Sequence, residues 1–398
     1  MFVPHTGRVS IAAGWALLAL ALAACPSRAQ QLRKDAIRVT PQDEAVLSAS
    51  GQKKELDCGV AVIKPQMQFD LRFHPGYTAT VGLKSIAGEG DMLRTVLRVT
   101  PLDPSGPPVV LTGELPVPPL STETGGETEL PVEYTVGPGR YRVDWLMRDR
   151  RNRVCSKHWT LEAELDERLE GVPLSLRPGA VDAASDDAFR ELANAPAREH
   201  GRLRVKVLIN FSGERESNSA ADGRDVRGVV SILRAVARDP LFGRFSIVAF
   251  SMKDRQVFYR QPESPEIDFP ALGNAVKKLK FGTVDYDVLR EHDGGANFLA
   301  TVLTEQIGAG QPAPDAVIVI SPNVMLDKKV ASERLARAGA SPCPVFYLNY
   351  NPDPLRNPWR GAISAALKAY RAVEYTIAAP RDLASALGNM ANSLRARR

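Results

Sequence analysis

The chain has 398 residues, of which 44% are hydrophobic and 24% are charged, so it is long enough for two domains with proper cores. The net charge of +5 is modest, and the basic finish at Arg395, Arg397 and Arg398 is more typical of a solvated helix end than of a nucleic-acid-binding arm. The cysteines form no Cys-x-x-Cys motif or Cys/His cluster, which argues against zinc.

The N-terminus has the pattern of a secretory signal. Arg8 is followed by an uncharged apolar run, Ile11 to Ala24, which is too short to span a bilayer comfortably, and small residues come next. Residues 1–29 are therefore predicted to be a signal peptide of a bacterial protein. We expect the mature protein to be periplasmic or secreted, without a transmembrane helix.

Cleavage of this signal has two alternatives. Ser27-Arg28-Ala29 places small residues at positions −3 and −1 of a cut before Gln30. Leu22-Ala23-Ala24-Cys25 instead resembles a bacterial lipobox, in which Cys25 would carry lipid and tether the protein to a membrane. An uncleaved membrane anchor is a third alternative, and the sequence leaves all three open.

The next two segments differ in their hydrophobic pattern. Residues 30–55 are polar and lack periodicity, which predicts a leader or linker. Residues 56–165 contain about seven short alternating segments punctuated by Gly and Pro, such as MQFDLRFH, YTATVGLKSI and GRYRVDWLMRD. This pattern predicts an antiparallel β-sandwich, with Val143, Trp145 and Met147 pointing inward, and it is generally similar to immunoglobulin-like domains.

Three cysteines remain after Cys25. Cys58 and Cys155 lie near the two ends of the strand-rich region, whereas Cys343 sits between prolines before an apolar strand. Because an exported protein meets an oxidising compartment, we expect a disulfide between Cys58 and Cys155 and a buried thiol at Cys343. The alternative is that all three are unpaired core residues.

The pattern changes again in the C-terminal half. Residues 166–200 are charged, Ala-rich and broken by Pro, which predicts a linker. From residue 201, apolar strands such as LRVKVLINF, RFSIVAFSM and PDAVIVISPN alternate with helices. This alternation predicts an α/β domain over 201–398 with a doubly wound, mostly parallel sheet, in which residues 204–211 form a central strand.

The order of motifs in residues 201–398 resembles a von Willebrand factor type A domain. A first strand enters the loop Asn210-Phe211-Ser212-Gly213-Glu214, a second ends in Ala249-Phe250-Ser251, and the double-glycine loop Asp293-Gly294-Gly295-Ala296-Asn297 opens a helix. A later strand ends in Ile320-Ser321-Pro322-Asn323. The resemblance implies a Rossmann-type sheet whose strand ends hold a divalent cation.

The ligands that this family uses for its cation are mostly replaced here. The family pattern is an Asp-x-Ser-x-Ser loop, a Thr after the double glycine and an Asp that ends the fourth strand. The corresponding residues are Asn210, Ser212, Glu214, Ala296 and Pro322, of which only Ser212 keeps its type. Because hard cations prefer anionic oxygen ligands, we predict a degenerate site without metal or other cofactor. Glu214 and Asp293, or the acidic insertion FGTVDYDVLREHDGG, are the alternative sources of charge.

Two further features bear on function. The loop NYNPDPLRNPWRG carries Tyr350, Leu355, Arg356 and Trp359, a combination of aromatic and arginine side chains that marks contact surfaces, although Trp359 packing onto a helix is the alternative. Catalysis by Ser212 would need a hydrolase elbow, Gly-x-Ser-x-Gly, which is absent. We therefore predict an exported, non-catalytic interaction module for an unidentified protein partner. A structural spacer in an envelope assembly and a Ser212 hydrolase are the alternatives.

Overall fold

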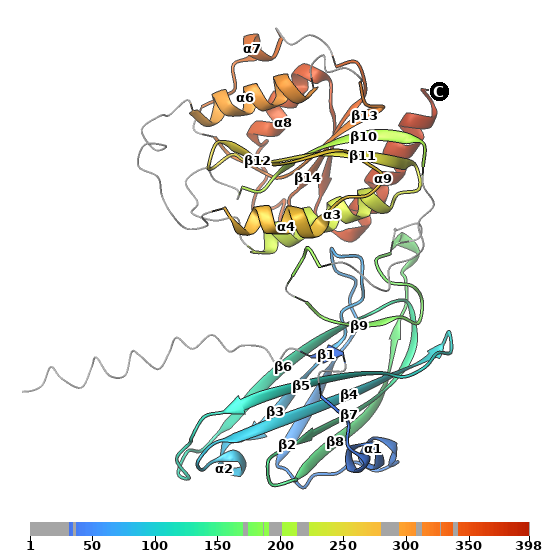
Figure 1. The fold of residues 1–398 in the computed structure, drawn as a ribbon, viewed down its shortest axis with the longest axis vertical. Helices are drawn as coiled ribbons and strands as arrows, with labels where there is room; N and C mark the ends of the chain where they lie inside the picture. Colours follow the sequence, from blue (N-terminus) through green and yellow to red (C-terminus); the bar gives the residue numbers. More distant parts are fainter. Residues whose placement is uncertain are drawn as a thin grey trace, which may run out of the picture.

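The two halves of the chain form two β-sheet-rich bodies joined by a narrow junction (Figure 1). The computed structural model describes residues 32–34, 37–169, 174–185, 187–190, 201–212, 223–279, 294–307, 313–326, 328–336 and 341–397. No helix in these ranges is long and apolar enough to cross a membrane.

The N-terminal body is a sandwich of two antiparallel sheets. One sheet has the order β1-β5-β4-β7-β8 and the other the order β2-β3-β6-β9. The strands are β1 (Arg33–Lys34), β2 (Cys58–Ile63), β3 (Gly76–Gly82), β4 (Asp91–Asp103), β5 (Val109–Val117), β6 (Glu127–Val136), β7 (Gly139–Arg148), β8 (Val154–Ala163) and β9 (Val181–Ala183), with a short helix, α2 (Leu83–Ile86), after β3.

The core of the sandwich lies between the inner faces of these sheets. Along β7, alternate side chains point inward, so Val143, Trp145 and Met147 are fully buried, which confirms the predicted alternation. The Trp145 ring contacts Tyr77 of the facing sheet at 5.6 Å between centroids, in an edge-on arrangement. This contact packs the inner faces of the two sheets against each other.

The segment predicted as a polar leader, residues 30–55, needs a correction. Residues 33–34 form β1 on the edge of one sheet, and residues 41–48 form the helix α1 (Pro41–Ser48). Thr40 caps this helix, since its Oγ1 accepts a hydrogen bond from the Asp43 backbone N–H at 3.1 Å. Leu47 packs with Leu146 on the outer face of the sandwich. The helix is too short to show a periodic pattern, and its one buried polar residue, Asp43, accepts a hydrogen bond from Arg148 of β7.

The segment predicted as a linker, residues 166–200, also takes part in the fold where it is described. Residues 181–183 form β9, which pairs with β6, and Phe189 is buried in the core of the C-terminal half. The charged and Pro-broken sequence concealed this role, because β9 is only three residues long.

The C-terminal body is built on a six-stranded sheet with the order β12-β11-β10-β13-β14-β15. β10 lies between β11 and β13 and is parallel to both, so it is a central strand. The strands are β10 (Leu203–Asn210), β11 (Phe242–Ser251), β12 (Gln256–Ser264), β13 (Ala316–Pro322), β14 (Val345–Tyr350) and β15 (Val373–Ile377).

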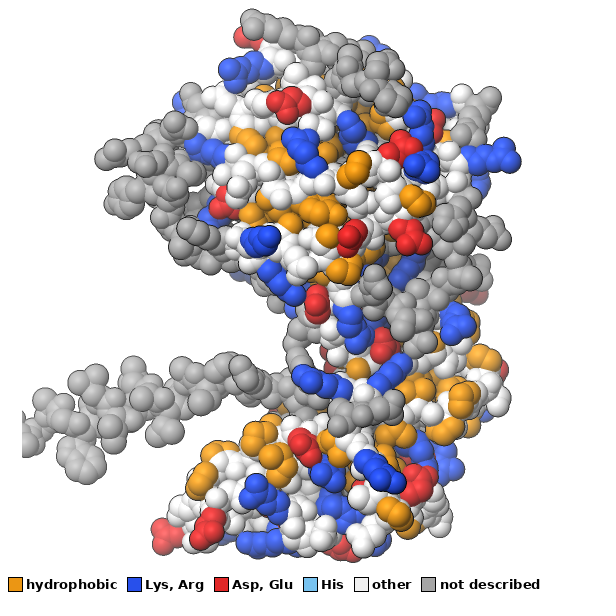
Figure 2. All heavy atoms as spheres, in the orientation of Figure 1, with side chains coloured by type: hydrophobic (Ala, Val, Ile, Leu, Met, Phe, Trp, Pro, Cys, Tyr) orange, Lys and Arg blue, Asp and Glu red, His pale blue; other side chains and the backbone are white. Residues whose placement is uncertain are grey.

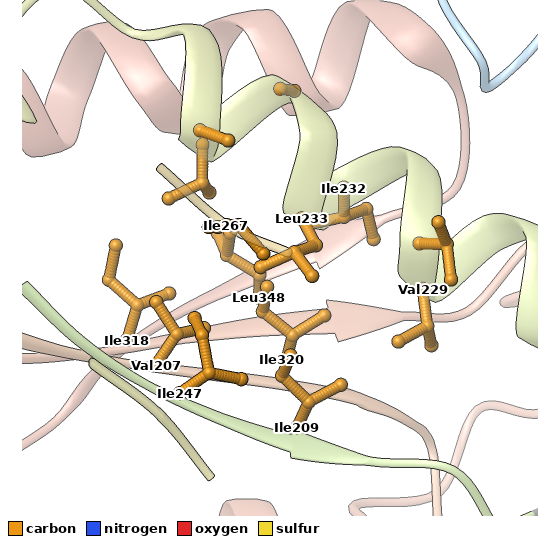
Figure 3. Close-up of a cluster of buried hydrophobic side chains, with 14 of the residues drawn as sticks. Val207, Ile209, Val229, Ile232, Leu233, Ile247, Ile267, Ile318, Ile320 and Leu348 are labelled. Atoms are coloured by element: carbon orange, nitrogen blue, oxygen red, sulfur yellow. The ribbon is translucent and has the colours of Figure 1, made fainter. Parts of the chain in front are cut away.

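Helices lie on both faces of this sheet (Figure 1). Figure 3 shows Val207, Ile247 and Ile320 of the sheet directed toward Val229 and Leu233 of α3. Leu208 and Val319 of the same strands are buried on the opposite face, in a separate cluster. The helices are α3 (Gly223–Arg238), α4 (Phe269–Lys277), α6 (Gly294–Ile307), α7 (Ser332–Ala336), α8 (Ala362–Leu367) and α9 (Pro380–Arg395).

The predicted fold class is corrected for the chain as a whole. In the described part of the chain the strands form three sheets, and eight of the twelve strand pairings are antiparallel. The four parallel pairings all lie in the C-terminal sheet. The described fold is therefore dominated by β structure, because the sandwich is wholly antiparallel and β12 pairs antiparallel with β11 at the edge of the C-terminal sheet.

The cysteine pair predicted from the sequence, Cys58 and Cys155, is disulfide-bonded, with a Cα–Cα distance of 6.3 Å. Cys58 begins β2 at the edge of one sheet, and Cys155 lies on β8 at the edge of the other. The bond therefore links the two sheets of the sandwich. Cys343 is a free, half-buried thiol.

Candidate functional site

A cavity of about 600 Å³ lies at the junction between the two bodies. On the sandwich side it is lined by residues 67–74, by β6 and by residues 184–190. On the other side it is lined by α3, by the residues that follow β14 and by the start of α9. A volume of this size is typical of small-molecule sites, which often lie between domains.

The residues between β2 and β3 form the wall of this cavity on the sandwich side. Phe73 pairs with both Met67 and Val136 in isolated β-bridges, which fix the segment against β6. Leu71 is buried within the core of the C-terminal body. Phe69 contacts Tyr350 at 5.2 Å between ring centroids, almost perpendicular to it. Apolar side chains thus anchor the segment and leave the polar residues between them facing the cavity.

His74 bridges two carboxylates in this wall. Its Nε2 lies 2.9 Å from both carboxylate oxygens of Asp70, and its Nδ1 lies 2.6 Å from Oε1 of Glu133. Gln68 donates a second hydrogen bond to Glu133 at 2.9 Å. Burial alone would lower the pKa of His74, but the hydrogen bonds that its ring donates to Asp70 and Glu133 outweigh it and raise this pKa to about 9. His74 is therefore an imidazolium at neutral pH.

This raised pKa predicts a stability that depends on pH. The folded pKa of about 9 exceeds the unfolded value of 6.5, so the contribution is complete below pH 6.5 and is lost as the pH rises through 9. We expect the free energy of unfolding to fall by about 2–3 kcal/mol between these limits. Urea unfolding across the window measures it, with His74→Gln as the reference in which this fall disappears. Equal slopes in both proteins would contradict the assignment.

Arg72 lies beside this triad and is almost completely buried, with 7% of its surface exposed. Its Nε is buried without a hydrogen-bond partner among the described residues. The nearest carboxylate oxygen, Oδ2 of Asp70, is 3.6 Å from that Nε, which is an ion-pair distance. Burial lowers the pKa of Arg72, against the opposing charge of Asp70.

Arg234 of α3 adds a second buried cation to the same cavity. Its guanidinium donates to the backbone oxygens of Ala188 and Arg190, at 2.8 and 2.6 Å, and lies over the Phe269 ring at 4.1 Å. Burial first, and then the charge of Arg72, lower the pKa of Arg234 to about 10. The two arginines therefore repel each other across the cavity.

Cations outnumber anions in the described lining of the cavity. Its charged side chains are Arg72, Arg190, Arg227, Arg234 and the imidazolium of His74 against Asp70, Glu133 and Asp187. Basic and acidic side chains also lie beside each other at the narrow junction on the face shown in Figure 2. An excess of cationic side chains in a cavity can attract an anion, even though acidic side chains are also present.

Asn210 and Ser212, the first two residues of the predicted degenerate metal site, form a satisfied network at the end of β10. The side-chain oxygen of Asn210 accepts from the backbone N–H of Ser212 at 3.1 Å, and its amide nitrogen donates to Ser321 Oγ at 3.0 Å. Ser212 Oγ accepts from the Lys253 N–H at 3.0 Å. Both residues are buried, and the network uses their oxygens internally.

The other predicted metal-site positions either lack a side-chain ligand or lie outside the described residues. Ala296 is buried in α6, and Pro322 ends β13. Glu214 and Asp293 lie outside the described residues, as does the insertion at 281–293. Within the described ranges no group of three or more His, Cys, Asp or Glu side chains is placed to hold a metal ion. The absence of metal binding stays a prediction.

Calorimetry tests that prediction directly. Titration of the mature protein with millimolar Mg²⁺, Mn²⁺ or Ca²⁺ should give no saturable heat, because Asn210 lacks the negative charge that offsets ion dehydration and Ala296 and Pro322 offer no side-chain oxygen. Ser212→Ala is the matched variant. Stoichiometric heat that is lost in this variant would show that a cation is bound there.

The four predicted surface residues lie in two different environments. Tyr350 is buried, lines the cavity, and places its ring where a Cβ of Gly228 would stand. It is therefore part of the domain junction and not of an exposed contact surface, because it ends β14 among the buried side chains of α3 and α9 and contacts Phe69 of the sandwich side. Leu355 is 93% exposed and Arg356 is exposed, whereas Trp359 is half-buried. Leu355 and Arg356 remain predictions for a partner contact.

The polar residues of the cavity were not predicted from the sequence. The stretch FDLRFH was interpreted as an ordinary half-buried strand, but it lies between β2 and β3 and is held by bridges instead. Residues 69–72 form a turn, and Asp70, Arg72 and His74 all line the cavity. Three charged or titratable residues so close together beside core residues would have indicated a polar site.

Comparisons with known proteins do not assign the chain to a family. No protein family and no curated protein matches the chain. The solved structures found include a Northeast Structural Genomics Consortium target, SoR45, at TM-score 0.20 and 14% identity, covering 29% of this chain and 96% of that one. Spo0M, a sporulation control protein from Bacillus subtilis, has TM-score 0.17 and 13% identity over 31% of this chain and 54% of its own.

A β-glucuronidase from Bacteroides uniformis is found at TM-score 0.19 and 12% identity, covering 76% of this chain and 34% of that enzyme. The chain thus matches about half the length of Spo0M and about a third of the glucuronidase. At these TM-scores the likenesses carry neither fold nor function.

No family model matches the chain, so the comparisons give no support for the resemblance of residues 201–398 to a von Willebrand factor type A domain. The sequence pattern is not specific to one family, because apolar strands that alternate with helices indicate only that a sheet is buried on both faces. Many covered sheets share this pattern, and the one family-specific feature, the metal-ligand set, is replaced in this chain.

Proposed function

We propose that this protein is an exported, non-catalytic binding protein that holds its ligand in the cavity between its two bodies. The observation that carries the proposal is Arg72, a nearly buried arginine that lines this cavity and whose Nε has no hydrogen-bond partner among the described residues. An unsatisfied buried polar group costs free energy unless a ligand or water satisfies it, so its presence in a cavity favours binding.

The surroundings of Ser212 support a non-catalytic role. Among the described residues, Ser212 Oγ has only the Ser251 hydroxyl at 3.4 Å and the backbone N–H of Lys253 as hydrogen-bond partners. Neither is a general base, and Ser251 uses its own proton to donate to Asp254 at 2.6 Å. The hydrolase alternative therefore has no geometry in its favour.

A thermal-shift screen tests binding without assuming a ligand. The mature protein, residues 30–398, is heated with separate panels of organic acids, organic phosphates, amino acids, sugars and neutral aromatics. We expect at least one panel to raise Tm. Ser185→Trp at the cavity wall should abolish the rise. Ser121→Trp is the matched control, since both serines accept from a backbone N–H two residues on and Ser121 does not line this cavity.

The second candidate function, a structural spacer, is favoured by the shared core at the junction. Leu71 of the sandwich side is buried with α3 residues such as Leu233 in one hydrophobic cluster. Two bodies fused in this way form a stiff unit that a spacer requires. If no panel in the screen raises Tm, the binding proposal is rejected and the spacer function is adopted.

Export rests on the N-terminal pattern and is supported by the Cys58–Cys155 disulfide, a bond that persists in oxidising compartments. We expect the mature protein to begin at Gln30 without lipid, or to carry fatty acid at Cys25 that is lost in Cys25→Ala. N-terminal sequencing and fatty-acid labelling of fractionated cells distinguish the two. An intact Met1 in the cytoplasmic fraction would contradict export.

A further inference from the structure

The ligand class follows from which charged side chains of the cavity already have partners on the protein. The three acidic side chains of its lining all have partners on the protein. Asp70 and Glu133 are held by His74, and Asp187 accepts from the Phe189 N–H at 2.9 Å. By contrast, the guanidinium of Arg72 has only a distant ion pair, and that of Arg234 bonds to backbone oxygens without a carboxylate.

The uncharged part of the lining is mixed, with polar side chains such as Gln68, Thr135 and Ser231 beside an apolar patch. Met67, Phe69, Tyr350 and Pro380 contribute to its lining, and the Phe69 and Tyr350 rings contact each other across the domain junction. A bare inorganic ion would leave this surface without a partner. A ligand that fits both parts has an apolar body and an anionic head.

We infer that the cavity binds a small organic anion, with an apolar body against Phe69 and Tyr350 and a carboxylate or phosphate head on the guanidinium of Arg72. This inference rests on the proposed binding function and names its ligand class. The planar fork of a guanidinium presents two parallel N–H donors to either head group, and burial strengthens that contact. Asp70 limits the affinity, because its carboxylate stands 3.6 Å from Arg72 Nε and competes with the anion.

The test uses three probes with a common body, namely 3-phenylpropionate, phenethyl phosphate and the neutral 3-phenylpropionamide. Thermal shift is titrated at constant ionic strength to obtain an apparent Kd for each probe. We expect the acid or the phosphate to bind and the amide to bind at least about tenfold more weakly. The tighter of the two anions identifies the head group.

Two variants change the affinity in opposite directions. Arg72→Gln should weaken binding of the anionic probe at least about tenfold, because it removes the guanidinium fork. Asp70→Asn should lower the Kd of this probe about threefold, because the competing charge is removed. Tighter binding cannot result from misfolding, so this second variant decides the matter if Arg72→Gln does not fold. Arg94→Gln, which removes an exposed arginine of β4, should change the Kd less than about twofold.

Several results would overturn the inference while leaving the binding function intact. These are equal affinity for the amide and the acid, an unchanged Kd in Arg72→Gln, or weaker binding in Asp70→Asn. Stabilisation by a panel of the earlier screen that contains no anions would do the same. If no panel and no probe stabilises the protein, the binding function itself fails, and the ligand class fails with it.

Discussion

Replacing both Cys58 and Cys155 by alanine is expected to lower the free energy of unfolding by about 4 kcal/mol. The disulfide closes a loop between residues 97 apart in sequence, and its removal gives the unfolded chain all the conformations that this closure forbids. It also joins edge strands of the two opposed sheets, so the sandwich loses a covalent link that no hydrogen-bond ladder replaces.

Urea unfolding of the double variant against the wild type measures this loss, and unfolding of the wild type under reducing conditions should reproduce it. Cys343→Ala is the matched control, since Cys343 is free and half-buried and should cost less than about 1.5 kcal/mol. A double variant as stable as the wild type would show that the bond does not form in the protein.

The sequence predicts those parts of the fold in which hydrophobic periodicity is continuous. The alternation around Trp145 identifies the inward residues of β7, and the apolar run from Val205 to Ile209 identifies a strand buried on both faces. The pattern fails for β1, α1 and β9, because they contain two, eight and three residues. In such short elements neither the helical nor the strand period repeats often enough to be recognised.

The cavity could not be predicted, because its residues come together only after the two bodies pack. Arg72 and Arg234 are more than a hundred residues apart, and each alone resembles an exposed polar residue beside a core position. Tyr350 was interpreted as part of an exposed loop, although it is the last residue of a buried strand. Local patterns report the burial of each element, whereas this site depends on tertiary contacts between distant ones.

A second ionic network, on the outer face of the sandwich, is the basis of the other large effect. Asp144 on β7 is 1% exposed and accepts hydrogen bonds from Arg98 Nε at 3.0 Å, Arg142 Nε at 2.9 Å and His158 Nδ1 at 2.9 Å. Arg98 in turn donates to the Leu47 carbonyl of α1 at 2.7 Å. Burial would raise the pKa of Asp144, but the bonds from His158, Arg142 and Arg98 outweigh it and lower this pKa. Asp144 therefore stays ionised and anchors α1 through Arg98.

Asp144→Ala is expected to destabilise the protein by about 3–5 kcal/mol, because it removes the buried carboxylate that Arg98, Arg142 and His158 share. Arg98, whose side chain is 13% exposed, then keeps only the more exposed Glu44 as an ion-pair partner among the described residues. Glu114→Ala is a closely matched control. Glu114 and Asp144 are each directly opposite an arginine of β4, Arg94 and Arg98, but the side chain of Glu114 is 41% exposed. Water solvates that pair, so its loss should cost less than about 1 kcal/mol. Equal losses in the two variants, measured by urea unfolding at pH 7, would show that burial of the Asp144 network contributes nothing to stability.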